Sequence, residues 1–227
     1  MAPKEPPAEV AEIRHAIAEF FSQTDDSGTR IGAACGVYAF FDYDGEPIYV
    51  GQTVEGLAGR VGRHLTGRRS DAVGKFVLDP FEVLDIEVWP VPRSGLLNRK
   101  EKRVLKPVTD RIEYAVYQQA LAGSRFGAVL NEGVIQPAEP IDLPPSYRGR
   151  IIPDDLYATR VHPDIRLARR AATIASLARL ISERQIGKGL RTTLRVQCQR
   201  LEALSSQRLA DFAEDPDEVE DDSADSN

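Results

Sequence analysis

Two tyrosines, each close to a glycine, are the first residues of this chain whose types and spacing could support chemistry. Tyr38 and Tyr49 lie in the segment GVYAFFDYDGEPIYVG, residues 36–51. The Asp44-Gly45 pair between them predicts a two-residue hairpin turn, because glycine readily adopts the positive φ that such a turn requires. That turn pairs position 40 with 49 and 38 with 51, so both phenols lie diagonally on one face of the ribbon. Taken alone, strand tyrosines are more often half-buried packing residues.

Four polar residues further along the chain could join them. Arg60 and His64 are four residues apart in a helical pattern, so they project from one face of that helix. A later helix, with Thr109 expected as its N-cap, carries Glu113 on its apolar stripe, where a solvated carboxylate has little reason to lie. Asn131 ends a short apolar run. Each has an ordinary alternative role, as a surface charge, a helix charge at the edge of the core or a turn residue.

The order of these six residues resembles the GIY-YIG nuclease family. The sequence GVY is followed by YVG, by an Arg and a His four residues apart, by a helical Glu and by an Asn. Val37 and Val50 stand where the family name has isoleucines, which leaves the polar groups unchanged. The resemblance covers residues 35–133, and it rests on six polar positions in the right order rather than on one short motif.

The resemblance implies an enzyme, a divalent-metal-dependent endonuclease that hydrolyses DNA phosphodiester bonds. Its role would be restriction or defence against foreign DNA, or DNA processing by a standalone nuclease. Mg²⁺ is the expected cofactor, with Mn²⁺ as an alternative, because magnesium keeps its waters and needs few protein ligands. The alternative function is a non-catalytic nucleic-acid-binding protein on a retained GIY-YIG scaffold.

The resemblance also implies a role for each residue. Glu113 would bind the metal and Arg60 would hold phosphate oxygens, which its planar guanidinium suits. Tyr38 would deprotonate the attacking water, although a free phenol with a pKa near 10 is a weak base at neutral pH. His64 would relay that proton, and the roles of Tyr38 and His64 can be exchanged. Tyr49 would position the phosphate or the nucleophile, and Asn131 would orient the site.

A basic surface beside the site would hold the DNA backbone, since most protein–DNA contacts go to phosphates. The segment NRKEKRVLKP, residues 98–107, is expected to be a basic loop before the Glu113 helix. The residues expected to bind nucleic acid are Arg63, Arg68, Arg69, Arg99, Lys100, Lys102 and Arg103. The charges of such a loop ordinarily face only water. Next to a phosphodiesterase site, contact with DNA phosphates becomes the favoured interpretation.

The fold class expected is α+β, with a small three-stranded antiparallel sheet flanked by helices and a C-terminal helical hairpin. The third strand comes from EVLDIEVWPV, residues 82–91, in which apolar residues alternate. The chain divides into an N-terminal amphipathic helix in 1–30, a nuclease core in 31–135, a Pro-rich linker in 136–160, a basic helical arm in 161–212 and a disordered acidic tail in 213–227.

Charge is segregated along the chain, although the net charge is only −6. Residues 151–210 hold 11 Lys and Arg against 5 Asp and Glu, whereas residues 211–227 hold 9 acidic residues and no basic one. The arm is expected either to pack as a module, with a homodimer through it as one outcome, or to contact DNA. The sequence contains no long apolar run or signal pattern, so a cytoplasmic protein without a membrane partner is expected.

Overall fold

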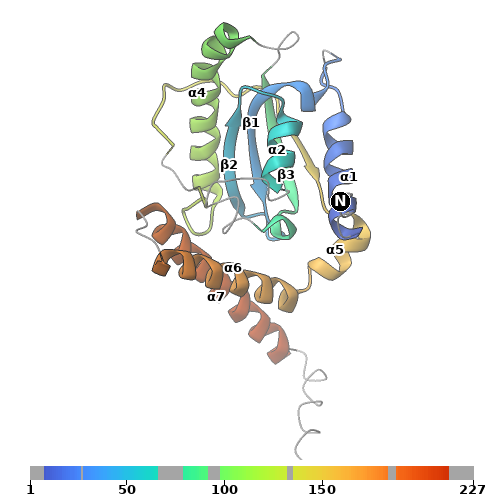
Figure 1. Cartoon of the computed structure of the whole chain (residues 1–227). Coiled ribbons are helices and arrows are strands. Elements are labelled where there is room, and N and C mark those ends of the chain that lie inside the picture. The colour runs from blue at the N-terminus through green and yellow to red at the C-terminus, as the bar shows by residue number, and fades with distance from the viewer. Residues whose placement is uncertain are drawn as a thin grey trace, which may run out of the picture.

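The fold is known from a computed structural model, which describes residues 8–26, 28–65, 79–91, 98–131, 135–183 and 188–214. Helices lie on both faces of one antiparallel sheet, and a helical arm follows the sheet (Figure 1). The elements in chain order are α1 (Ala8–Ser22), η1 (Ile31–Ala33), β1 (Cys35–Phe41), β2 (Pro47–Thr53), α2 (Leu57–Leu65), η2 (Pro80–Glu82), β3 (Asp85–Val91), α4 (Arg99–Gly123), β4 (Tyr147–Arg150), α5 (Asp154–Arg160), α6 (Pro163–Glu183) and α7 (Lys188–Glu214). Within these residues no helix is long and apolar enough to cross a membrane.

The sheet confirms the α+β class but has four strands in the order β2-β1-β3-β4, not the three expected. The fourth strand, β4, lies inside the expected Pro-rich linker and pairs with β3 from Asp85↔Arg150 to Val88↔Tyr147. Gly149 lets α1 pack on this strand, because a Cβ there would lie 2.6 Å from Cδ2 of Phe20. A four-residue strand with two arginines and a glycine shows too little alternation to be recognised from sequence.

The hairpin of β1 and β2 has the expected register near the tyrosines but a different turn. Phe40 pairs with Tyr49 and Tyr38 with Gly51, as predicted. The prediction of a two-residue turn at Asp44-Gly45 was wrong. Gly45 N–H donates to the Asp42 carbonyl at 3.1 Å, and of the turn residues only Gly45 has a positive φ, of 72°. The turn therefore has three residues and a bulge, and the register shift between Phe40 and Phe41 restores the predicted pairing.

The two faces of the sheet carry different helices. On one face, Tyr38, Phe40 and Tyr49 pack with α1 and α2, whose buried residues include Ile13, Ile17, Leu57 and Val61. On the other face, Val37, Ala39 and Val50 pack against α4 through Ile112, Val116 and Ala120. Strand β2 is at an edge of the described sheet, and Gln52 is its half-buried residue while the other residues of the strand are buried.

Helix α4 begins eleven residues earlier than predicted. Asn98, not Thr109, is its N-cap, and Glu101 completes a capping box with it. The expected basic loop is therefore the first turns of α4, and Thr109 is a buried residue inside the helix whose hydroxyl donates to the Lys106 carbonyl at 3.0 Å. Pro107 lies inside the helix, which continues through it.

Helices α6 and α7 form the predicted helical hairpin and pack against each other, with Leu177, Leu180, Leu190 and Val196 buried. Residues 215–227 of the expected acidic tail lie outside the described residues. Within the described part of the arm, the apolar stripes expected to support a homodimer are mostly covered by the chain itself.

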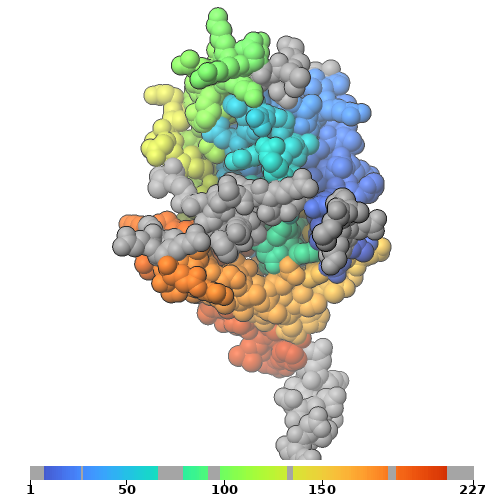
Figure 2. Space-filling view, viewed as in Figure 1, coloured from blue at the N-terminus to red at the C-terminus, as the bar shows by residue number. Residues whose placement is uncertain are grey.

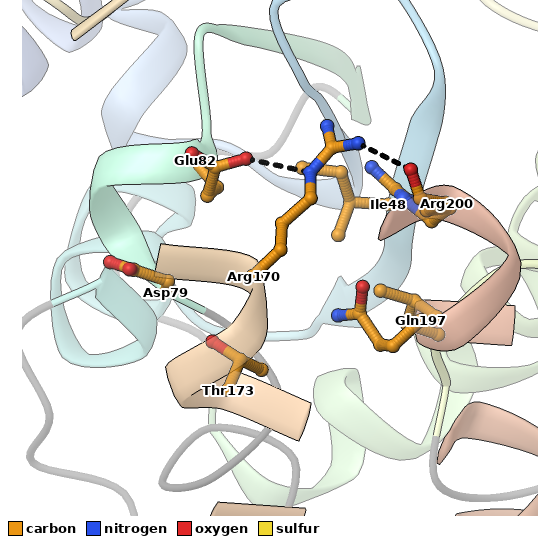
Figure 3. A pocket seen from close by; sticks show the side chains of 8 residues that line it. Ile48, Asp79, Glu82, Arg170, Thr173, Gln197 and Arg200 are labelled. Atoms are coloured by element: carbon orange, nitrogen blue, oxygen red, sulfur yellow. Dashed lines mark hydrogen bonds and ion pairs between the residues drawn. The ribbon is translucent and has the colours of Figure 1, made fainter. Parts of the chain in front are cut away.

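Buried ion pairs attach this arm to the turn of the β1–β2 hairpin. Arg170 Nη2 lies 2.8 Å from Asp42 Oδ2 and its Nε lies 3.1 Å from Glu82 Oε2. Figure 3 shows the Arg170 side chain between Glu82 and Arg200, at a cavity of about 20 Å³. Arg166 and Arg200 pair with Asp44 and Asp42. These three arginines are at most 5% exposed, so they hold the arm in place and are not a DNA-binding surface.

Candidate active site

The two tyrosines lie side by side on the face covered by α2. Their ring centroids are 6.1 Å apart, and Phe40 stacks on Tyr49 at 5.9 Å. Tyr38 is fully buried and Tyr49 is 9% exposed, so Tyr49 is the phenol closer to solvent. The diagonal placement predicted from the strand pairing is what the structure shows.

His64 completes this aromatic group from α2. Its Nδ1 lies 3.0 Å from the Tyr38 hydroxyl oxygen, and its ring is 4.4 Å from the ring of Tyr49 in an edge-on arrangement. The imidazole is 1% exposed. A neutral imidazole nitrogen at this distance can accept the phenolic proton, which is the contact that a proton relay between the two groups requires.

The glycines beside the tyrosines make room for other residues of the protein. Gly51 lies opposite Tyr38, and a Cβ there would be 2.7 Å from the Tyr38 hydroxyl oxygen. Gly36 has a φ of 152°, and a Cβ there would be 2.2 Å from the Trp89 carbonyl oxygen. Gly51 therefore makes room for the Tyr38 ring, and Gly36 for the neighbouring strand β3.

Asn131 is bound to the free edge of β2 directly after Tyr49. Its Oδ1 accepts from Val50 N–H at 3.1 Å and its Nδ2 donates to the Val50 carbonyl at 2.7 Å. Leu130 N–H also donates to the Ile48 carbonyl, at 2.8 Å. The amide thus satisfies both polar groups of one residue on an unpaired strand edge and fixes the strand that carries Tyr49.

Glu113 lies on the helix that covers the opposite face and meets the sheet at Gln52. Gln52 Nε2 donates to Glu113 Oε2 at 2.6 Å and also to Asp110 Oδ1. Burial raises the pKa of the Glu113 carboxyl above its usual value, and Asp110 adds to this, while the Gln52 hydrogen bond and the charges of Lys106 and Arg60 oppose it.

Arg60 lies on helix α2 with His64, and its positive charge acts to lower the pKa of the Glu113 carboxyl. Its Nε is buried without a hydrogen-bond partner. A guanidinium with an unused donor beside a carboxylate suits an incoming phosphate oxygen.

The structure thus arranges the predicted site residues as two groups along the β2 edge. Tyr38, Tyr49 and His64 are in direct contact on one face, and Glu113 meets Gln52 on the other. Sequence reasoning missed Gln52 and Asp110. Alternation along β2 after Tyr49 places residue 52 on the α4 face, and Asp110 is three residues before Glu113, so both signals were present.

The donor set fits a hard divalent cation. Glu113 supplies carboxylate oxygens, the Asp110 carboxylate adds a second negative charge beside it, and Gln52 Oε1 is a buried acceptor without a hydrogen-bond partner. Oxygen donors of this kind suit Mg²⁺, which binds through one or two carboxylates and keeps several waters. Among the described residues there is no group of three or more His, Cys, Asp or Glu side chains placed to hold a metal.

The residues expected to bind nucleic acid lie mostly on the start of α4. Arg99, Lys100 and Arg103 are exposed, and Figure 2 shows this end of the helix projecting from the rest of the molecule. On its inner side Lys102 lies 3.5 Å from Glu55, which also pairs with Arg63 at 3.2 Å. Arg68 and Arg69 lie outside the described residues.

Comparison with protein families gives one match, in which residues 34–112 correspond to the GIY-YIG catalytic domain. The match begins before β1 and ends inside α4, so it includes Tyr38, Tyr49, Arg60 and His64 but stops one residue before Glu113. Neither curated proteins nor solved structures give a match to the chain.

Proposed function

Because residues 34–112 belong to the GIY-YIG family as a catalytic domain of nuclease type, we propose that this protein is a divalent-metal-dependent endonuclease that hydrolyses DNA phosphodiester bonds. The observation that carries the proposal is the hydrogen bond of 3.0 Å between the Tyr38 hydroxyl and His64 Nδ1. A phenol buried against an imidazole next to a second phenol gives the core a proton-transfer pair, which a purely structural aromatic cluster would not need.

The carboxylate group supplies the cation site in this proposal. Glu113 is the metal ligand, and a bound Mg²⁺ or Mn²⁺ would stabilise the charge that develops on the phosphate and on the leaving oxygen. Arg60 binds a non-bridging phosphate oxygen, which is supported by its unpartnered Nε and by the effect of its charge on Glu113. The scissile phosphate then lies along the edge of β2.

Proton transfer is assigned to the aromatic group. Tyr38 accepts a proton from the attacking water and passes its own to His64, or His64 acts on the water through Tyr38, because the hydrogen bond permits both directions. Tyr49, the more exposed phenol, positions the phosphate or the nucleophile. Asn131 orients the site through its two hydrogen bonds with Val50.

The projecting start of α4 is proposed to bind the DNA backbone. Arg99, Lys100 and Arg103 are exposed there, on the same helix as Glu113. With a rise of about 1.5 Å per residue, Arg103 and Lys100 lie about 15–20 Å from Glu113 along the helix axis. Phosphates several nucleotides away from the cut would therefore contact this end of α4.

Restriction or defence, or DNA processing by a standalone nuclease, is the proposed role. Cleavage of both strands by an enzyme with a single site would favour a homodimer, and Leu209 of α7 is 72% exposed and available to a partner. Sedimentation of the protein with and without DNA would show whether such a homodimer forms.

The proposal is tested by nicking of a supercoiled plasmid with Mg²⁺, with EDTA as the metal-free control. We expect wild-type protein and Glu19→Ala, an exposed glutamate on α1, to nick at equal rates, and Glu113→Ala to be inactive. A non-catalytic DNA-binding protein would shift the plasmid in a gel without nicking it. Cleavage that persists in Glu113→Ala would remove Glu113 from the site.

A further inference from the structure

Gln52 lies at the centre of a chain of polar contacts that ends at Glu113. The proposed function gives Gln52 itself no role. Its Nε2 donates to Asp110 Oδ1 and, at 2.6 Å, to Glu113 Oε2. Asp110 also accepts from Lys106 one turn earlier on α4. The contacts therefore run from Lys106 through Asp110 and Gln52 to Glu113, and only Gln52 comes from the sheet.

The amide is suited to join two carboxylates. Asp110 and Glu113 are three residues apart on one helix face, where two negative charges repel each other. The two N–H groups of Gln52 can satisfy one oxygen of each carboxylate, which fixes the direction in which Glu113 presents its other oxygen. A leucine of similar size at residue 52 would fill the space without supplying either hydrogen bond.

We propose that Gln52 is a positioning residue, which holds the Glu113 carboxylate in the orientation that binds the catalytic cation, with Asp110 as its anchor. The inference rests on the proposed function of Glu113 as the metal ligand. Hydrogen bonds from neighbouring groups to a metal-binding carboxylate orient it, and their loss costs about 10-fold to 100-fold in metal affinity.

The test compares Mn²⁺ binding by calorimetry in wild-type protein, Gln52→Leu, Asp110→Asn, Glu113→Gln and a control. Gln118→Leu makes the same substitution at an exposed position of α4. We expect Gln52→Leu to bind Mn²⁺ about 10-fold to 100-fold more weakly than wild type. Asp110→Asn keeps an oxygen that can accept from Gln52 Nε2, so its loss of Mn²⁺ affinity should be smaller than that of Gln52→Leu. Gln118→Leu should bind as wild type does.

Thermal unfolding and nicking rates separate positioning from a structural role. Gln52→Leu should show a lower kcat with an unchanged KM for plasmid, at a melting temperature within the range of the control. Equal or tighter Mn²⁺ binding by Gln52→Leu would overturn the positioning role while leaving the nuclease proposal intact. A loss in Asp110→Asn as large as in Glu113→Gln would overturn it too, because Asp110 would then be a ligand. Absence of Mn²⁺ binding by wild-type protein would overturn both proposals.

Discussion

At the scale of single residues, the buried position of Glu113 makes its carboxyl lose its proton at a higher pH than an exposed glutamate does. Burial raises its pKa above the ordinary value for glutamate of about 4.3. Only the ionised carboxylate binds a cation well, so we expect Mn²⁺ affinity to be full above this raised pKa and to fall as the pH drops through it.

Asp110→Asn provides the check on this pH dependence. The Asp110 charge contributes to the raised pKa of Glu113, so its removal should move the midpoint of the affinity curve to lower pH. Calorimetric titration at a series of pH values measures both midpoints. A midpoint that stays in place, or moves to higher pH, would contradict the electrostatic account of Glu113.

Gly51 allows the phenol of Tyr38 to lie across β2, and its substitution should disturb the aromatic group. In Gly51→Ala the new methyl would be 2.7 Å from the Tyr38 hydroxyl oxygen and 2.8 Å from Cε1 of Tyr49. Overpacking of this kind costs about 1–3 kcal/mol. We expect that loss in urea unfolding, together with slower nicking because the contact between Tyr38 and His64 is displaced.

Gly62→Ala is the matched control. A Cβ at Gly62 meets no atom within 4 Å, and the residue lies in helix α2. Alanine in a helix is about 0.5–1 kcal/mol more favourable than glycine, so this variant should be more stable than wild type. If Gly51→Ala were as stable as Gly62→Ala, the close packing of Tyr38 on β2 would be wrong.

The sequence was enough to place Tyr38 and Tyr49 on one face of a hairpin, because strand alternation is a local rule, whereas the family resemblance was needed to link His64 to them. It could not show that Glu113 approaches from the other face of the sheet, since that depends on how α4 packs across β1 and β2. Nor could it show that the group packed against Gly51 is the Tyr38 ring, because a glycine in a strand indicates only that some group packs closely on the backbone there.

At the scale of elements, α4 combines a basic end with Glu113, the proposed metal ligand, on one helix. Its first turns were expected to be a loop because Thr109 was expected to be the N-cap, but the helix begins at the capping box of Asn98 and Glu101. Lys100 and Arg103 are therefore held at a fixed distance from Glu113 rather than on a loop that could move independently.

Replacing both Lys100 and Arg103 by alanine should weaken DNA binding without changing the Mn²⁺ affinity. Each lost phosphate contact should reduce the slope of log K against log salt by about 1. Fluorescence anisotropy at several salt concentrations measures that slope. The control is Arg14→Ala, an exposed arginine on α1. An unchanged slope in the double variant would show that α4 does not contact phosphates.

At the scale of the whole molecule, the arm is part of the folded nuclease rather than an appendage. Arg170 and Asp42 are 5% and 1% exposed at the side chain, so their ion pair lies in the interior. Asp42 also accepts from the backbone N–H groups of Asp44 and Glu46 at 2.9 Å, and it thereby shapes the turn of the hairpin that carries both tyrosines. Arm and active site share this hairpin.

Arg170→Met should destabilise the chain strongly. It leaves Asp42 and Glu82 buried with fewer counter-charges, and breaking a buried ion pair from one side costs about 3–5 kcal/mol. Arg191→Met, at an exposed position of α7, should change the free energy of unfolding by less than about 0.5 kcal/mol. Urea unfolding measures both, and an equal effect of the two substitutions would show that the network does not hold the arm.

The helices of the arm could be predicted from their apolar spacing, whereas their attachment could not. The excess of arginine in residues 151–210 suggested a surface for DNA. Composition does not show that Arg166, Arg170 and Arg200 face three carboxylates more than 80 residues away in sequence. The strand β4 was missed for a similar reason, because its pairing with β3 is a long-range contact of a short segment.

The central claim is that the aromatic group and Glu113, on opposite faces of the sheet, act on one phosphate at the edge of β2. Single-turnover nicking rates of wild type, Tyr38→Phe, Glu113→Gln and the double variant test it directly. Residues that act as a unit are not additive, so we predict that the double variant is no slower than the slower single variant. Losses that multiply in the double variant would contradict the claim and would place the two groups in separate functions.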